Sequence, residues 1–179
     1  MIPQQQRGAG GVQQFYEMIG GAAATLLGLL FVSVSMNAEV ILSEAHTHSR
    51  RLAEQAFQNY LAVLVVSLFI FFPEITREAR GYTLLSISGV WAGWAAVRLA
   101  QTLWRRVPSD SIRTVLRRYL ATLIGFGMVG WSSFRSATSA ADTATVSAMG
   151  TMLLLISATI ASWELLINVA EEKYRSHKE

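Results

Sequence analysis

The sequence predicts an all-α integral membrane protein, a polytopic bundle of five transmembrane helices. Only 15% of its 179 residues are charged, whereas about 25% is usual for a soluble domain. Charged residues are also absent from long stretches, which favours helices that cross a bilayer core, because such a crossing takes about 20 apolar residues. These stretches are residues 18–38, 55–73, 81–97, 119–134 and 144–163.

The ends of these stretches set the boundaries of the predicted helices. We expect helices over residues 16–42, 57–72, 82–104, 119–134 and 145–169. Pro73 ends the second helix, because proline lacks the amide donor and disfavours helix in the residue before it. Pro108 separates the third from the fourth, where Ser109 or Asp110 can cap a short leading helix. The fourth helix is slightly shorter than the usual minimum of about 17 residues.

A soluble bundle explains the first helix poorly. Helices of soluble bundles keep a polar face, but residues 20–36 have Thr25, Ser33 and Ser35 as their only polar side chains. The stretch is also too long for the apolar core of a cleavable signal peptide. We therefore expect a retained transmembrane helix.

The predicted transmembrane domain covers residues 15–170, between two polar segments. Residues 1–14 are rich in Gln and Gly and are predicted to be a flexible leader, and residues 171–179 form a charged cytoplasmic tail. Residues 43–58 contain good helix formers and neither Pro nor Gly. We expect the first helix to continue through them beyond the membrane surface.

The distribution of basic residues predicts the orientation. The first and third loops and the C-terminal tail carry ten Lys and Arg residues, against four on the other side. Because cytoplasmic loops are enriched in Lys and Arg, we expect the N-terminus outside and the C-terminus inside, in a plasma membrane or bacterial inner membrane. This asymmetry also explains the net charge of +3, so no nucleic-acid partner is expected. Aromatic residues that mark the two membrane interfaces are Tyr16, Tyr82 and Trp131 outside and Trp104, Tyr119 and Trp163 inside.

Small residues indicate close helix packing, because membrane helices associate where their backbones approach. Gly89 and Gly93 form a GxxxG pattern in the third helix, and Gly125, Gly127 and Gly130 recur in the fourth. We expect these glycines to pack mainly within one bundle. Small residues on every helix also leave surface for association in the lipid bilayer, so we expect a homo-oligomer, with another membrane protein as a second candidate partner.

The string Ile124-Gly-Phe-Gly127 resembles the potassium-channel filter, a loop whose carbonyl oxygens replace the hydration shell of the ion. The resemblance covers these four residues, and Leu123 stands where the filter has threonine. A re-entrant loop here would also reverse the predicted charge asymmetry. We therefore interpret the glycines as a packing face.

The sequence argues against enzymatic, cofactor and metal chemistry. It has no Cys and no hydrolase, zinc-protease or nucleotide-binding motif. None of its three His residues lies in a predicted transmembrane helix, so a hydrolytic triad has no base. Glu44 and His48 share a helix face while His46 points away, which gives two ligands where a metal site needs three or four. We predict no enzyme activity, no cofactor and no metal.

The remaining candidates for a functional site are polar residues near the inner ends of the spans. Intramembrane polar residues are functional candidates by default, although long side chains near a helix end can extend to the interface instead. Arg98 and Glu164 lie at the same predicted depth, with Glu39 within about a turn of them. We therefore predict that Arg98 bonds Glu164 or Glu39. The predicted polar layer consists of Asn37, Glu39, Arg98, Glu164 and Asn168.

Two functional hypotheses follow from this layer and from the small-residue faces. The first is an oligomeric channel or transport-type protein that conducts an ion or a small solute past the polar layer. The second is a non-conducting accessory or regulatory subunit that binds a larger membrane protein.

Overall fold

The computed structural model describes residues 4–38, 47–71, 76–104, 109–138 and 143–176. Within these residues the regular structure is entirely α-helical, which confirms the predicted all-α class. The helices are α1 (Gln4–Met36), α3 (Thr47–Phe71), α4 (Arg77–Trp104), α5 (Ser109–Thr138) and α6 (Ala144–Ser176).

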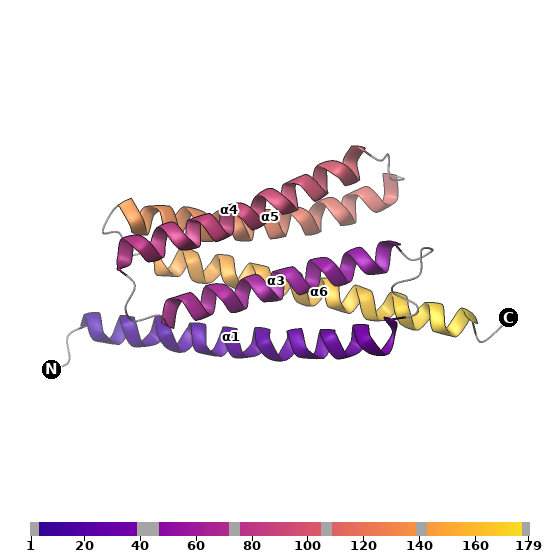
Figure 1. The fold of residues 1–179 in the computed structure, drawn as a ribbon, viewed down its shortest axis with the longest axis horizontal. Coiled ribbons are helices and arrows are strands. Elements are labelled where there is room, and N and C mark those ends of the chain that lie inside the picture. The colour runs from indigo at the N-terminus through magenta and orange to yellow at the C-terminus, as the bar shows by residue number, and fades with distance from the viewer. Residues whose placement is uncertain (1–3, 39–46, 72–75, 105–108, 139–142, 177–179) are drawn as a thin grey trace.

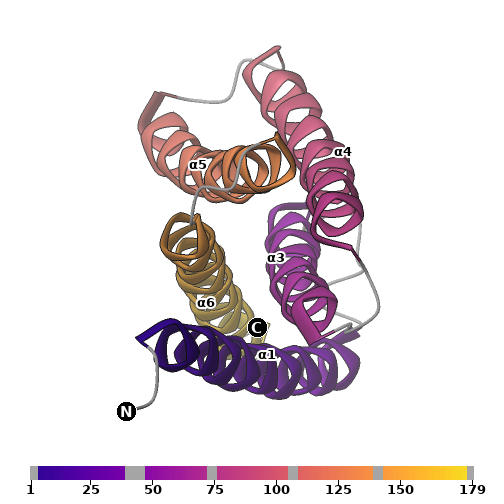
Figure 2. The same cartoon turned by 90° about the vertical axis from the view of Figure 1, so that its left-hand side faces the viewer.

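Successive helices run in opposite directions, so the two chain termini lie at opposite ends of the bundle (Figure 1). We call the end with the N-terminus the amino end and the other the carboxyl end. Viewed along the helices, α4 and α5 form one layer, α3 and α6 a second, and α1 covers the second layer from the other side (Figure 2). Packing is close for α4 on α5, α5 on α6, α6 on α3 and α3 on α1, whereas α3 touches α4 only briefly.

Four of the described helices are long and apolar enough to cross a membrane, namely α1, α3, α4 and α6. Helix α5 falls below this limit, although it runs beside α4 along the bundle (Figure 1). Its hydroxyl residues Thr122, Ser132 and Ser133 are buried, whereas Ile124 and Trp131 are exposed. The low hydropathy of α5 therefore comes in part from residues that face the interior.

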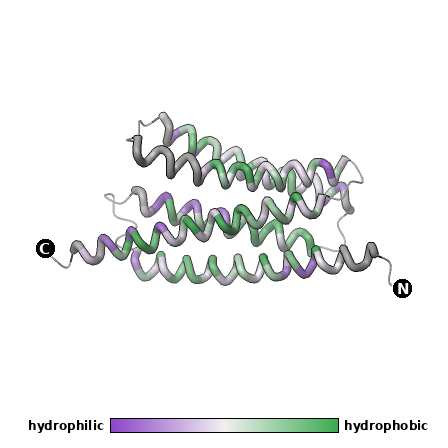
Figure 3. The backbone as a smooth tube through the Cα atoms, turned by 180° about the vertical axis from the view of Figure 1, so that it is seen from behind, coloured by the Kyte–Doolittle hydropathy of each residue, from purple (hydrophilic) through white to green (hydrophobic). Residues whose placement is uncertain are grey.

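Hydrophobic residues occur along all the described helices (Figure 3), and many of the large ones are exposed on the outer surface of the bundle. Soluble monomers rarely expose large contiguous apolar patches, so this surface is consistent with a membrane location. Large exposed apolar side chains occur on every described helix, among them Phe31 on α1, Leu68 on α3, Val90 on α4, Trp131 on α5 and Met152 on α6.

Two segments differ from the sequence prediction in a way that changes their interpretation. Helix α1 begins at Gln4, within the predicted leader, because Gln is a good helix former and no proline lies between Gln4 and Met36. The described helix in residues 43–58 belongs to α3, which starts at Thr47, rather than to α1, which ends at Met36. Helix α5 is continuous through residues 124–127, so the string that resembles a channel filter is not a re-entrant loop.

Two glycines allow a close helix crossing between α5 and α6. A Cβ added to Gly150 would lie 2.9 Å from the carbonyl oxygen of Gly125, and one added to Gly125 would lie 2.8 Å from Leu154 Cγ. Side chains do not fit at such distances from backbone, so the crossing requires glycine. Gly130 makes an ordinary contact with α4, where Ser88 Cβ is the nearest atom at 3.7 Å.

Gly89, Gly93 and Gly127 face away from the rest of the bundle. In the described part of the chain, no atom lies within 4 Å of a Cβ added to any of them. The neighbouring Ala92, by contrast, packs against a buried apolar cluster of α1, α3, α5 and α6. The GxxxG pattern of α4 therefore lies on the outer surface instead of at the contact predicted inside the chain.

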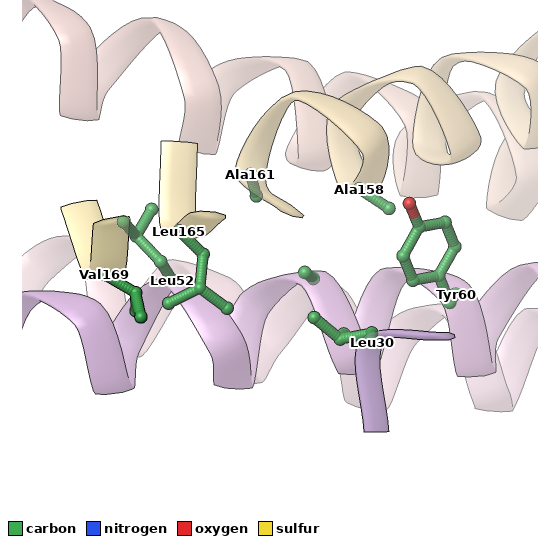
Figure 4. Close-up of a cluster of buried hydrophobic side chains, with 8 residues drawn as sticks. Leu30, Leu52, Tyr60, Ala158, Ala161, Leu165 and Val169 are labelled. Carbon is green, nitrogen blue, oxygen red and sulfur yellow. The ribbon is translucent and has the colours of Figure 1, made fainter. Parts of the chain in front are cut away.

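An apolar seam joins α1, α3 and α6 in the carboxyl half of the bundle (Figure 4). Tyr60 brings one polar atom into it, and this hydroxyl donates to Thr159 Oγ1 at 3.3 Å and accepts from Ser162 Oγ at 3.4 Å. Packing against α1 and α6 thus holds one face of α3. This dry seam consists of Leu30, Leu52, Ala56, Tyr60, Ala158, Ala161, Leu165 and Val169.

Candidate functional site

The other face of α3 carries the polar residues Glu54, Gln55, Gln58 and Asn59. Glu54 and Gln58 are four residues apart, as are Gln55 and Asn59, so the two pairs lie in neighbouring rows on one side of the helix. Gln55 and Asn59 are buried, and Glu54 and Gln58 are half-buried. This face borders a cleft between α3, α4 and α5, at the place where α3 and α4 touch only briefly. We call this site the polar cleft.

Four buried side chains from three helices form a hydrogen-bonded network at the base of the polar cleft. Gln55 Nε2 donates to Thr122 Oγ1 at 3.3 Å, and Asn59 Nδ2 donates to the same oxygen at 3.1 Å. Asn59 Nδ2 also donates to Ser157 Oγ at 3.4 Å, and the Thr122 and Ser157 hydroxyl oxygens lie 3.1 Å apart. The network therefore ties α3 to both α5 and α6.

The Thr122 hydroxyl lies at the centre of this network. It accepts from both the Gln55 and the Asn59 amides, and either it or the Ser157 hydroxyl donates in the bond between the two. Burial of a polar group is costly unless it is hydrogen-bonded, so the Thr122 hydroxyl stabilises the two amides as well as itself.

An ion pair between α3 and α4 lies at the mouth of the polar cleft, toward the carboxyl end. Arg98 Nη2 lies 3.1 Å from Glu54 Oε2, and Arg50 Nε lies 3.2 Å from Glu54 Oε1. The Arg98 guanidinium also stacks over the Trp94 ring, 4.3 Å from its centroid, which is within cation–π range. The Arg98 and Glu54 side chains are 35% and 34% exposed, so the pair lies where the cleft opens.

The polar cleft encloses a cavity of about 20 Å³, which is room for roughly one water molecule. Aromatic side chains of α4 and α5 form its far wall, including Trp91, Tyr119 and Phe126. The Trp91 and Phe126 rings lie 6.0 Å apart between centroids, within the range of aromatic pairing. The two rings lie on the amino-end side of the cleft, and the partly exposed Arg98–Glu54 pair lies on its carboxyl-end side.

Arg98 is the member of the predicted polar layer that lines this cleft. The carboxylate it contacts is that of Glu54, which the sequence prediction did not consider. Glu164 is half-buried on α6, which packs on α3 and α5 rather than along α4. Glu39 lies outside the described residues.

The other members of the predicted layer lie apart from the polar cleft. Asn37, directly after α1, donates from Nδ2 to the carbonyl oxygen of Ser33 in the last turn of that helix at 2.9 Å, and Asn168 is half-buried on α6. The side chains of the Glu44, His46 and His48 cluster lie outside the described residues. In the part of the chain that is described, no three His, Asp or Glu side chains gather as a metal site requires.

Two of the six predicted interfacial aromatics turn into the bundle. Tyr119 is buried and lines the polar cleft, and Tyr16 is buried near the amino end. The remaining four, Tyr82, Trp104, Trp131 and Trp163, are exposed.

The sequence carries a signal for Gln55 and Asn59 that charge counting overlooks. They stand four residues apart in an apolar span, and Asn and Gln side chains hydrogen-bond across membrane helices. Amide side chains carry no charge, so a search for charged residues passes over Gln55 and Asn59. Thr122 has no such signal, since hydroxyl residues occur on every helix.

Comparison with protein-family models, with curated proteins and with solved structures finds no match for this chain. The functional interpretation therefore depends on the geometry of the polar cleft.

Proposed function

We propose that this protein conducts an ion or a small polar solute through the polar cleft, as an oligomeric channel or transport-type membrane protein. The observation that carries the proposal is the buried network of Gln55, Asn59, Thr122 and Ser157 behind an open, charged mouth. An interhelical hydrogen bond in a membrane contributes only about 0.6 kcal/mol on average. Stability alone therefore gives little reason to bury four polar side chains beside a cavity, whereas a path for a hydrated species requires them.

All five helices span the membrane in this proposal, including α5, because its hydroxyl residues face the interior. The N-terminus is outside and the C-terminus is in the cytoplasm, in a plasma membrane or bacterial inner membrane. The mouth of the polar cleft then faces the cytoplasm.

Cysteine labelling tests this topology, because the chain has no Cys of its own. An impermeant thiol reagent should reach Ala140→Cys from outside and Asp110→Cys only from the cytoplasmic side. Labelling of both positions from one side would show that α5 does not cross.

Flux through liposomes that contain the purified protein tests conduction. A panel of small cations, anions and amino acids should include at least one species that the wild type passes. Asn59→Leu should abolish this flux, while Asn168→Leu, which changes an amide outside the cleft, should leave it intact. Equal flux in the two variants, or no flux of any species through the wild type, would contradict the proposal.

The exposed face of α4 favours a second function, that of a non-conducting accessory or regulatory subunit. Gly89, Gly93 and Ala96 are exposed, and small residues let a second helix approach closely. Gly93→Leu should then abolish association with a membrane partner, or with a second copy, and leave the chain folded. Ala92→Leu should instead disturb packing inside the chain. A protein that is silent in liposomes and that loses a co-purifying membrane protein on Gly93→Leu would support this alternative.

A further inference from the structure

A second hollow lies at the amino end of the bundle, where all five described helices contribute to its lining. Its volume is about 200 Å³, which is the space of several water molecules at roughly 30 Å³ each. We call it the amino-end pocket. Its polar lining includes Tyr16, Arg80, Ser133, Ser136, Thr143 and Ser147.

The charged group in the described lining of the amino-end pocket is a cation, Arg80. Arg80 lies in the first turn of α4 and is half-buried. Among the described lining residues it is the one charged side chain, and they include no carboxylate. The guanidinium carries five N–H donors and no acceptor, so the pocket is suited to a ligand that is anionic and rich in acceptors.

Two hydroxyl groups add donors to that charge. Tyr16 donates its hydroxyl proton to Ser147 Oγ at 2.9 Å, which leaves the Ser147 proton for another acceptor. Within the described residues, the half-buried Ser136 hydroxyl has no hydrogen-bond partner.

Other hydroxyls hold the wall of the amino-end pocket in place. Ser132 and Ser133 both donate to the carbonyl oxygen of Val129, at 2.8 and 2.7 Å. Thr143 Oγ1 donates to the carbonyl oxygen of Ser132 at 3.0 Å and so fastens the start of α6 to α5. The lining thus contains wall residues that bond to one another and two hydroxyls, those of Ser136 and Ser147, that donate no hydrogen bond within the described residues.

We propose that the amino-end pocket binds an oxyanion of the phosphate class, held by Arg80 with the Ser136 and Ser147 hydroxyls. The planar guanidinium matches phosphate in two parallel hydrogen bonds. The apolar spans of α4 and α6 begin at Glu78 and Ala144, so the pocket lies at the edge of the apolar region. Both a free oxyanion and the phosphate of a lipid headgroup reach this level. The inference goes beyond conduction, because binding here requires no flux.

Binding of a free oxyanion is tested by calorimetry. The full-length protein in a non-ionic detergent is titrated with inorganic phosphate at constant ionic strength. The wild type should bind saturably, and Arg80→Gln should weaken binding by about tenfold or more, as expected for loss of a charge-assisted hydrogen bond. Arg135→Gln is the matched control, because this exposed cation of the same end lies outside the pocket lining. Ser136→Ala removes a hydroxyl without a partner in the described residues, so it keeps the fold and should weaken binding by about fivefold.

Binding of a lipid headgroup is tested by native mass spectrometry, after the protein is exchanged into micelles that contain phosphatidylglycerol. Retention of this lipid by the wild type but not by Arg80→Gln or Ser136→Ala, without binding of inorganic phosphate, would assign the site to a lipid. If the wild type binds neither inorganic phosphate nor phosphatidylglycerol, the proposal is overturned. Equal weakening by Arg80→Gln and Arg135→Gln would overturn it too, since net charge alone would then explain binding. A protein that binds phosphate but passes no solute would contradict only the conducting function.

Discussion

The two faces of α3 differ in what they contact. Toward α1 and α6, Leu52 and Ala56 pack into the dry seam (Figure 4). Toward α4 and α5, Glu54, Gln55 and Asn59 border a cavity and bond to polar side chains. The difference shows that packing fixes one side of α3, while hydrogen bonds and open space characterise the other.

The bilayer explains why these two regions respond differently to substitution. Lipid tails are as apolar as leucine, so the dry seam is stabilised by close packing rather than by removal of its side chains from water. The polar cleft depends on hydrogen bonds that each contribute little. We therefore expect volume changes to be costly in the dry seam and polar changes to alter function more than stability in the cleft.

The largest loss of stability is expected for Leu165→Ala in the dry seam. Leu165 is 1% exposed, whereas its neighbour Leu166 is 46% exposed. A buried leucine truncation costs about 2–5 kcal/mol in soluble proteins, and we expect about 2 kcal/mol here because the water-transfer part is absent in lipid. Reversible unfolding in mixed micelles, followed by tryptophan fluorescence, measures the change. Leu166→Ala should stay within about 0.5 kcal/mol of the wild type, and equal losses would refute the packing of the seam.

Gly150→Ala should lower the free energy of unfolding slightly less, by roughly 1.5 kcal/mol, because the added methyl group overpacks the crossing. Its new methyl group would lie 2.9 Å from the carbonyl oxygen of Gly125, so the α5–α6 crossing that supports the far wall of the cleft must open. Gly127→Ala is the control on α5, where no described atom lies within 4 Å. The same unfolding measurement should show no loss for this control, because alanine is the better helix former. If Gly150→Ala does not lower the stability, the α5–α6 crossing is looser than described.

Thr122→Val should destabilise the protein by roughly 1 kcal/mol, because it keeps the shape of the side chain but removes the acceptor that the Gln55 and Asn59 amides share. Residues in one network are energetically coupled. The double variant Asn59→Leu with Thr122→Val should therefore lose less than the sum of the two single variants in the same unfolding assay. Strict additivity would show that the two side chains do not depend on each other.

The smallest effect on stability is expected at the Arg98–Glu54 pair, where both side chains are about a third exposed. Pairs with this exposure contribute less than about 1 kcal/mol. A double-mutant cycle of Arg98→Gln and Glu54→Gln, measured at low and high salt, should give a small coupling that decreases with salt. If Arg98→Ala is instead severely destabilising and Glu164→Gln restores stability, then Glu164 is the functional partner.

Charge-free stretches and prolines predict the all-helical fold and the helix ends at Phe71, Trp104 and Ala144 to within a residue, because both are local properties of the chain. The rotation of each helix about its axis is not a local property, because it depends on the other helices against which the helix packs. Gly89 and Gly93 carry a recognised packing pattern, yet α4 turns Ala92 inward and leaves the two glycines outside.

The candidate site was predicted only in part, for a similar reason. Arg98 stands out as an intramembrane charge, and the structure pairs it with Glu54. Glu54 lies in a segment that the sequence assigns to the aqueous loop side of the second span. Helix α3 begins at Thr47, ahead of the charge-free stretch, and this early start brings Glu54 beside α4.

Two adjacent alanines of α4 test most directly whether a water-accessible cleft lies inside an apolar exterior. Ala95 is buried and lines the polar cleft, whereas Ala96 is exposed on the outer surface. Each is replaced by Cys in this otherwise Cys-free chain, and the protein in liposomes is exposed to Ag⁺, a small thiol-reactive cation. Thiols react as thiolates, which form in water and not in lipid. We predict that Ala95→Cys is modified and Ala96→Cys is protected; modification of Ala96→Cys with protection of Ala95→Cys would contradict the polar cleft.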